Sequence, residues 1–209
     1  MQNEQRIESF LERSLLSNEE FNNFLIDKTA EYVFSGLSRR EARARAIKDW
    51  KEHPPVLRDY LQSDQSSINP IQDDAFGKGY IDVASLTPNN CILAFKDEIV
   101  GMIYGEIIES TAELKTVVVD PDYRNVGIAS RLVKEFMSRC ESSGVKRITS
   151  PAWKVGDGIP AERLLLRFGF VATKIIEGYW TEDSQARGYR CPTCGFPCSC
   201  DAVIFEYTY

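Results

Sequence analysis

The hydrophobic pattern of the chain changes its period near residue 65. Before that point apolar residues recur at helical spacing, and two Ser-x-x-Glu sequences, at Ser17 and Ser38, have the form of capping boxes that begin helices. Loop-forming residues over 64–70 then interrupt the helical period. The pattern therefore predicts a helical N-terminal region, residues 1–65, and a larger domain, residues 66–209.

The larger domain alternates strand and helix signals. Its first half has β-branched and alternating apolar residues, which predict an antiparallel meander, and Gly127 begins an amphipathic helix that continues to about Ser142. The predicted strands are 80–84, 91–95, 99–108, 112–119, 146–150, 170–176 and 202–207, and a short helix is predicted over 161–168. This order predicts a chain of the α+β (α/β) class.

The turn between Val119 and Gly127 predicts an anion-binding site. The first turn of a helix presents N–H groups without intrahelical partners, together with the positive end of the helix dipole. Gly127 has no Cβ, so the backbone there can approach a ligand oxygen closely or adopt a positive φ. We therefore expect the diphosphate of a nucleotide-tailed cofactor to bind over 124–129.

This segment resembles motif A of the GNAT superfamily of acyl-CoA-dependent N-acyltransferases, Arg/Gln-x-x-Gly-x-Gly/Ala, in the sequence Arg124-Asn-Val-Gly-Ile-Ala129. The preceding Val-x-Pro-x-Tyr, the helix and a later Leu-Arg-Phe-Gly-Phe run follow in the family's order. The resemblance implies a mixed, mostly antiparallel central sheet flanked by helices, and an N-acetyltransferase that transfers an acetyl group from acetyl-CoA to a primary amine by direct attack. The cofactor-binding residues that it implies are Val117, Val118, Val119, Arg124, Asn125, Val126, Gly127, Ile128 and Ala129.

The resemblance also implies where the chemistry takes place. In the family's fold strands four and five splay apart, so that the pantetheine arm pairs with the strand-four backbone and the amine enters from the other side. The Val119 N–H, at the end of strand four, is the candidate donor to the oxyanion. Glu113 lies eleven residues before Arg124, where some histone-type members carry their general-base glutamate. A solvated glutamate at a strand start is the alternative interpretation of Glu113.

The usual general acid of the family is missing. Leu165 stands where many members have a tyrosine that protonates the leaving thiolate. Tyr104 or Tyr179 could replace it, water could serve, or the thiolate could leave unaided, because a thiol of pKa about 8.5 is a tolerable leaving group. A catalytically weak module of the same fold, which binds acyl-CoA or a protein partner, is therefore the alternative function.

Four cysteines within ten residues predict a metal site near the C-terminus. Cys-Pro-x-Cys-Gly is the usual form of a zinc knuckle, in which a turn directs two thiolates at one metal ion. Four protein ligands leave no open position, so a zinc ion here would be structural. Iron–sulfur ligation and disulfides are the alternatives. The cysteines lie in an insertion, 178–201, that either tunes acceptor choice or acts as a peripheral staple, and the predicted ligands are Cys191, Cys194, Cys198 and Cys200.

Composition and charge narrow the expected partners. The 209 residues are 43% hydrophobic and 27% charged, with a formal net charge of -6, as expected of a soluble globular chain. The acidic balance argues against nucleic-acid binding and favours a cationic acceptor, either a small amine or an amine of a peptide or protein. The basic residues over 39–51 form a solvated helix face, or contact an acidic partner or the phosphates of CoA. The chain has neither a membrane-spanning apolar run nor a secretory signal, so we expect no membrane partner and a cytoplasmic location.

Overall fold

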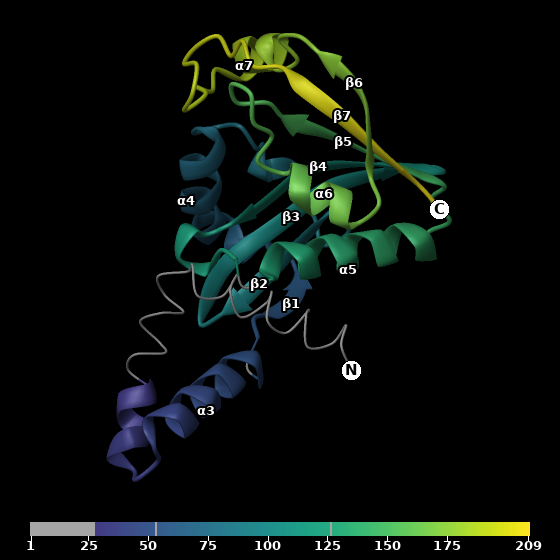
Figure 1. The fold of residues 1–209 in the computed structure, drawn as a ribbon. Coiled ribbons are helices and arrows are strands. Elements are labelled where there is room, and N and C mark those ends of the chain that lie inside the picture. The colour runs from purple at the N-terminus through teal and green to yellow at the C-terminus, as the bar shows by residue number, and fades with distance from the viewer. Residues whose placement is uncertain (1–27, 53, 126) are drawn as a thin grey trace.

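A computed structural model describes residues 28–52, 54–125 and 127–209. They form an open sheet with helices on both faces, and a helical N-terminal segment extends beyond one end of it (Figure 1). The first predicted capping box, at Ser17, lies outside the described residues. No helix in the described ranges combines the length and the apolar character needed to cross a bilayer.

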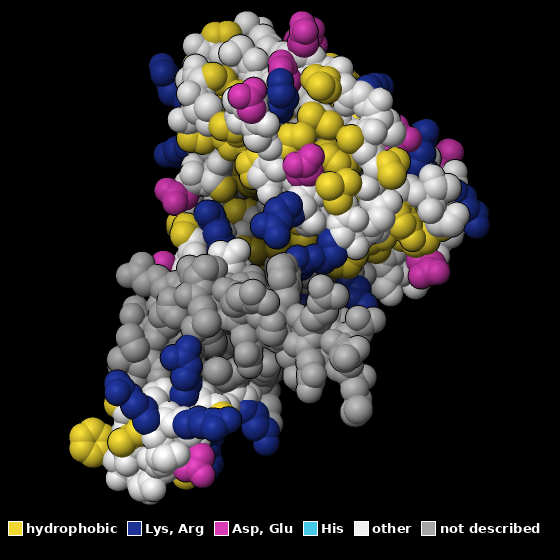
Figure 2. Space-filling model, viewed as in Figure 1, with side chains coloured by type: hydrophobic (Ala, Val, Ile, Leu, Met, Phe, Trp, Pro, Cys, Tyr) yellow, Lys and Arg dark blue, Asp and Glu magenta, His cyan; other side chains and the backbone are white. Residues whose placement is uncertain are grey.

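The second predicted capping box begins helix α3, Arg39–Glu52. The Ser38 N–H donates to the Glu41 carboxylate at 3.1 Å, and the Glu41 N–H donates to the Ser38 hydroxyl at 3.4 Å. This reciprocal pair satisfies two backbone donors and confirms the predicted helix start. A shorter helix over 28–34 precedes α3. Exposed basic side chains gather around α3 at the lower left of Figure 2.

Seven strands form one sheet in the order β1-β2-β3-β4-β5-β7-β6. All neighbouring pairs are antiparallel except β4 and β5, which run parallel. The predicted mixed, mostly antiparallel sheet is therefore confirmed. The strands are β1 Val56–Asp59, β2 Cys91–Lys96, β3 Glu98–Ile108, β4 Thr111–Val119, β5 Arg147–Trp153, β6 Val171–Ile176 and β7 Ala202–Thr208.

Helices bury the apolar side chains of both sheet faces. Helix α5, Ile128–Ser142, and helix α6, Glu162–Arg167, pack into one core, whereas α4, Gln65–Phe76, packs into a second core on the other face. The buried side chains of α5 form the predicted apolar stripe, and they are Ile128, Leu132, Val133, Phe136 and Cys140. The remaining short elements are α7, Thr181–Arg187, and the 3-10 helices η1 Gln62–Asp64, η2 Val83–Ser85 and η3 Pro121–Tyr123.

The strand predicted over 80–84 is wrong. Residues Val83–Ser85 form η2, and the first strand is β1, which pairs antiparallel with β2. An edge strand of four residues has too few positions to show alternation, so the hydrophobic pattern did not reveal it. An ion pair between Arg58 and Asp64, at 2.7 Å, then joins β1 to η1.

The loop predicted over 64–70 is also wrong, because these residues form the end of η1 and the first half of α4. Pro70 lies inside α4 and lacks the N–H that a helix interior needs. The helix persists because tertiary contacts outweigh this cost: Ile68 and Ile71 are buried in the core on that sheet face. A division of the chain at residue 65 would separate β1, an edge strand of the sheet, from α4, which packs on a face of that sheet.

Candidate active site

Strands β4 and β5 diverge and leave an opening in the sheet. Their parallel pairing joins residues 111–113 of β4 to residues 147–149 of β5. Just beyond this pairing, the Ser150 hydroxyl donates to the Leu114 carbonyl at 3.1 Å. From Leu114 to Val119, β4 therefore forms one wall of the opening.

The backbone of β4 presents hydrogen-bonding groups to this opening. The Asp120 N–H donates to the Val100 carbonyl of β3 at 3.0 Å. Because successive residues of a strand direct their N–H groups to opposite edges, those of Val117 and Val119 point away from β3. The predicted oxyanion donor, the Val119 N–H, thus lies on the edge that faces the opening. Val118 instead directs its backbone to β3 and buries its side chain on the α4 side.

The turn after β4 leads directly into the N-terminus of α5. Gly127 is the N-cap residue, with a φ of 88°, and Asn125 also has a positive φ, of 64°. The Arg124 Nε donates to the Val119 carbonyl at 2.9 Å, which holds the turn against the end of β4. The N–H groups of residues 128–129 belong to the first helical turn and have no acceptor within the helix.

The space in front of Gly127 is open. No atom of the described residues, apart from the chain neighbours of Gly127, lies within 4 Å of the position that a Cβ would take there. Val126, which belongs to the predicted cofactor-binding set, lies outside the described residues. The rest of that set comes together at one place, where the end of β4 meets the first turn of α5 (Figure 1).

A cluster of polar side chains lies on the α4 face of the sheet beside the opening. The Lys115 Nζ is 2.8 Å from the Glu106 carboxylate, which also accepts a hydrogen bond from the Tyr104 hydroxyl at 2.7 Å. A β-bulge brings Lys115 to this face, because β4 has one extra residue opposite the step from Tyr104 to Gly105. Sequence reasoning missed Glu106 and Lys115, since regular alternation gives no sign of the extra residue.

Glu113 is the last β4 residue that pairs with β5, so it lies where the two strands begin to separate. Its neighbours Ala112 and Leu114 are buried in the α5 core, and alternation therefore directs Glu113 to the face of the polar cluster. Burial raises the pKa of Glu113 above its ordinary value of 4.5, Lys115 opposes this shift, and the Glu106 carboxylate adds to it. A half-buried carboxyl with a raised pKa is suited to general-base chemistry.

Leu165, which stands where the resemblance led us to expect a tyrosine, lies on α6. Its side chain is 1% exposed and packs in the same core as Val119 and Ile128. Of the two tyrosines considered as replacements, Tyr104 donates its hydroxyl to Glu106. Tyr179 is 36% exposed and lies near enough to Glu113 and Lys115 for their charges to affect its pKa.

Four thiols converge on one point in the loop before β7. The Sγ atoms of the predicted ligands, Cys191, Cys194, Cys198 and Cys200, all lie within 4.8 Å of one another, with hydrogen-bonded separations of 3.4, 3.6 and 3.8 Å. A tetrahedron with Zn–S bonds of about 2.3 Å has an edge of ~3.8 Å. These separations fit four thiolates around a single metal ion, and they exceed the S–S bond of a disulfide, about 2.05 Å.

Backbone N–H groups stabilise two of these sulfur atoms. The Ser199 N–H donates to the Cys194 Sγ at 3.3 Å, and the Thr193 N–H donates to the Cys191 Sγ at 3.4 Å. Burial by itself raises the pKa of Cys194, but the bond from Ser199 and those among the thiols lower that pKa to about 6. Burial raises the pKa of Cys200, to about 11, and that of Cys198. Metal binding requires thiolates, so an ion at the centre of the four sulfur atoms would displace these thiol protons.

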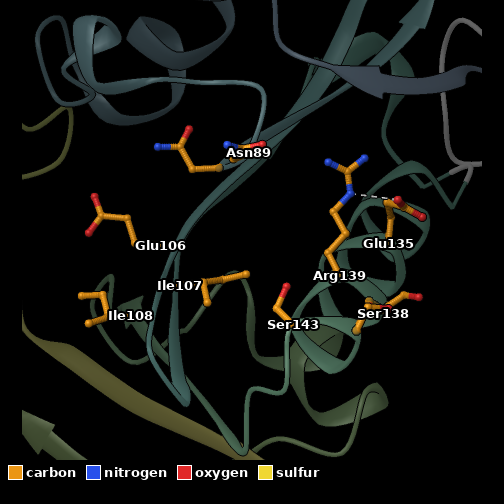
Figure 3. A pocket seen from close by; sticks show the side chains of 10 residues that line it. Asn89, Glu106, Ile107, Ile108, Glu135, Ser138, Arg139 and Ser143 are labelled. Carbon is orange, nitrogen blue, oxygen red and sulfur yellow. Dashed lines mark hydrogen bonds and ion pairs between the residues drawn. The ribbon is translucent and has the colours of Figure 1, made fainter.

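A separate hollow of about 760 Å³ lies beside the C-terminal half of α5. In Figure 3 Ile107 of β3 lies on the side of the strand that faces α5, whereas Glu106 points to the other side. The Arg139 Nε donates to Glu135 at 2.9 Å across this surface. The hollow is at the opposite end of α5 from Gly127, so it offers no helix N-terminus to a phosphate group.

Comparison with known proteins agrees with this geometry. The sequence model described as Acetyltransferase (GNAT) family matches residues 47–170. No curated protein sequence matches the chain. Among solved structures, Ard1 from Thermoplasma volcanium is similar, with a TM-score of 0.59 and 18% identity over 74% of this chain and 97% of that one.

Two further solved structures have the same fold. Naa50 from Arabidopsis thaliana, in complex with the bisubstrate analogue CoA-Ac-MVNAL, has a TM-score of 0.57 and 17% identity over 74% of this chain and 98% of that one. The ribosomal-protein-S18-alanine N-acetyltransferase from Escherichia coli has a TM-score of 0.53 and 16% identity over 73% and 92%. The family match covers more than half of the chain and includes β4, the turn and α5. The chain therefore belongs to the GNAT family of acetyltransferases.

Proposed function

We propose that the protein is an N-acetyltransferase that transfers the acetyl group of acetyl-CoA to a primary amine by direct attack. The observation that carries this proposal is the opening between β4 and β5, which connects the raised-pKa carboxyl of Glu113 with the open N-terminus of α5. Backbone groups of Val117 and Val119 along that wall suit the amides of pantetheine. The first turn of α5 suits the pyrophosphate.

The proposed chemistry needs a neutral amine and a stabilised oxyanion. Glu113 accepts a proton from the attacking amine, whose nitrogen forms the new bond to the acetyl carbon. The N–H of Val117 or that of Val119, both on the β4 edge that faces the opening, donates to the oxygen of the tetrahedral intermediate, where negative charge develops. Glu113 lies about 13 Å along the strand from Val117 and ~20 Å from Val119, so the amine proton reaches it through water. The C–S bond then breaks and the CoA sulfur leaves. Glu113 acts in its ionised form, so activity should fall as the pH falls through its pKa, which is raised by burial.

The charge around the opening favours a cationic acceptor. Two carboxylates, Glu106 and Glu113, lie on this face, and Lys115 forms an ion pair with the first of them. The solved relatives are consistent with this class, since one is bound to an analogue that joins CoA to a peptide and another is named for a protein alanine. The proposed acceptor is therefore a primary amine of a peptide, a protein or a small molecule.

This function is tested by incubating the full chain with acetyl-CoA and a panel of small amines, peptides with free N-termini and lysine peptides. We expect amine-dependent release of CoA, together with a mass increase of one acetyl group on at least one acceptor. The opposite result, tight acetyl-CoA binding without turnover on any acceptor, would favour a GNAT-fold module that binds acyl-CoA or a protein partner. We consider this second function because Leu165, a buried residue with no proton to donate, stands at the position where the resemblance led us to expect a general-acid tyrosine.

We also propose that the four thiolates hold a structural zinc ion. Protein purified under reducing conditions should contain about one zinc per chain, and iron would indicate an iron–sulfur site instead. Chelation or Cys194→Ser should loosen residues 179–201 in hydrogen exchange, because Cys191, Cys198 and Cys200 form part of the buried cluster that holds this segment, while acetyl-CoA affinity stays largely unchanged. Acceptor turnover should fall more than cofactor affinity.

Ser199→Ala is the matched control for the metal prediction, because Ser199 is exposed and contributes only its backbone N–H to Cys194. This variant should retain metal and hydrogen-exchange protection. Absence of both zinc and iron from reductively purified protein would show that the ligands are misassigned. Equal loss of cofactor and acceptor binding in Cys194→Ser would show that the loop is not independent of the cofactor site.

A further inference from the structure

Positive charge gathers in the helical N-terminal segment, residues 28–52, although the chain as a whole is acidic. This segment holds seven of the 25 lysines and arginines of the chain but only four of its 31 acidic residues. It projects beyond one end of the sheet, and its basic side chains are exposed there (Figures 1 and 2). The net charge of -6 therefore does not describe the charge of this segment.

The basic residues of α3 share one exposed face of the helix. Ala42 is buried, whereas the side chains of Arg39, Arg40 and Arg43 are exposed. Arg43 follows Arg39 by four residues and Arg40 by three, so the three guanidinium groups are neighbours along the helix. Lys48 is also exposed and follows Arg40 by two helical turns. We call Arg39, Arg40, Arg43 and Lys48 the basic face.

The arginines of the basic face are not neutralised within the part of the chain that the structure describes. Glu41 is the only acidic residue between Arg39 and Lys48, and its carboxylate accepts hydrogen bonds from the Ser38 N–H and hydroxyl instead. No ion pair among the described residues includes any of the three arginines. Arg39 and Arg40 also lie in the first helical turn, where the helix dipole disfavours positive charge. Helix stability therefore does not account for this charge.

An exposed aromatic ring lies close to the basic face in the chain. Phe34 ends the helix over 28–34 and is 93% exposed. Only residues 35–38 separate it from the first turn of α3. In the same helix the ring of Tyr32 is covered by the Arg45 guanidinium, 5.0 Å from the ring centre. The segment thus combines arginines without ion-pair partners with a phenyl ring that is open to stacking.

This combination favours a nucleic acid over a membrane or an acidic protein. A helix that lies on a bilayer buries an apolar face among the lipids. Among the exposed side chains described for α3, Ala44 alone is apolar. Guanidinium groups bind phosphate oxygens bidentately, and aromatic rings stack on unpaired bases. An acidic protein would supply carboxylates to the arginines but no stacked base to Phe34.

We propose that the basic face and Phe34 bind an RNA that has unpaired bases. The arginines and Lys48 hold backbone phosphates, and Phe34 stacks on one base of a loop or an end, where RNA presents bases that are not paired. The acidic remainder of the chain repels the phosphates, so binding is confined to this segment. The proposal is independent of the proposed acetyltransferase function, because none of its residues lies in the site between 104 and 129.

The first test titrates the full chain into a fluorescein-labelled single-stranded RNA and measures fluorescence anisotropy at several salt concentrations. Four phosphate contacts predict that log K falls with log salt with a slope of about -3. The double variant Arg40→Ala/Arg43→Ala should bind about tenfold more weakly, with a slope nearer to about -1.5. Circular dichroism should show that the helix is retained, because alanine favours helix. Lys174→Ala is the matched control, since it removes one exposed positive charge from β6, at the opposite edge of the sheet from β1.

The second test separates stacking from charge. Phe34→Ala should weaken RNA binding by about tenfold, the scale of one stacked base, while the slope with salt stays unchanged. Val33→Ala is its matched control, because Val33 is the adjacent residue, is 43% exposed and has no ring. The same RNA annealed to its complement should bind more weakly than the single strand, since paired bases cannot stack on Phe34.

Three results would overturn the proposal. The first is no binding of the wild-type chain to single-stranded RNA at low salt, or unchanged affinity and slope in Arg40→Ala/Arg43→Ala. The second is competition by polyglutamate of equal charge as effective as that by RNA, which would assign the surface to acidic proteins. The third is binding to phosphatidylserine vesicles but not to RNA, which would assign it to a membrane. None of these measurements depends on acetyl transfer, so they leave the proposed function untouched.

Discussion

Gly127→Val is expected to weaken acetyl-CoA binding by about a hundredfold, equivalent to ~2.7 kcal/mol. Gly127 caps α5 with a φ of 88°, a conformation that costs a β-branched residue about 1–2 kcal/mol. The new side chain would also occupy the open space in front of the first helical turn, where the pyrophosphate is proposed to bind. Relief of the strain by a backbone shift would move the donor N–H groups, so either response reduces affinity. Isothermal titration calorimetry with acetyl-CoA measures the effect.

Gly144→Val provides the matched control for the proposed pyrophosphate site at residues 124–129. Gly144 follows the other end of α5, has a φ of 77°, and its Cβ would also meet no described atom within 4 Å beyond its excluded chain neighbours. This variant should therefore suffer a similar loss of stability, measured by thermal unfolding, while acetyl-CoA binds normally. Wild-type affinity in Gly127→Val would count directly against a pyrophosphate site at residues 124–129.

Glu113→Gln is expected to lower kcat by about 10²–10⁴-fold while acetyl-CoA affinity changes little, because a general base acts on the acceptor amine and not on the cofactor. Glutamine keeps the size of the side chain and removes its basicity. The acidic limb of the wild-type pH–rate profile should lie above pH 4.5, since the pKa of Glu113 is raised, and it should disappear in the variant.

Substitutions of two other glutamates provide a control and a second measurement for this test. Glu109→Gln changes an exposed residue in the nearby turn between β3 and β4 and should leave the profile unaltered. Glu106→Gln should move the acidic limb to lower pH, because the Glu106 carboxylate raises the pKa of Glu113 and its removal also releases Lys115 from an ion pair. A pH–rate profile that is the same in Glu113→Gln and the wild type would remove Glu113 from the mechanism.

The elements that form the proposed cofactor site could be recognised because they are contiguous in the sequence. β4, the turn and α5 follow one another within residues 111–142, and each leaves a local signal: β-branched alternation, Asp-Pro turn chemistry, and a glycine before an apolar stripe. The convergence of the four cysteines was predicted for the same reason. Their spacing is a local property, and the structure brings the four sulfur atoms within 4.8 Å of one another.

The acceptor side could not be predicted in this way, because its residues meet only through tertiary structure. The bulge at Lys115 depends on how β3 and β4 pair, and no pattern within either strand reveals it. The loop before β7 packs against Gly77, at the end of α4, and a contact between such distant segments leaves no local signal in the sequence. Helix α4 was missed because its polar residues and Pro70 hide a helix that tertiary burial stabilises.

Tryptophans that pack with the four-cysteine segment, residues 191–200, give the protein an intrinsic fluorescence probe of this segment. The chain has three tryptophans. Trp180 belongs to the buried cluster that contains Cys191, Cys198 and Cys200, and Trp153 packs against that cluster. Indole fluorescence depends strongly on polarity and on nearby sulfur, so binding or release of metal by these cysteines should alter the emission of two of the three tryptophans. A zinc titration of the unlabelled protein can therefore be followed by its intrinsic fluorescence.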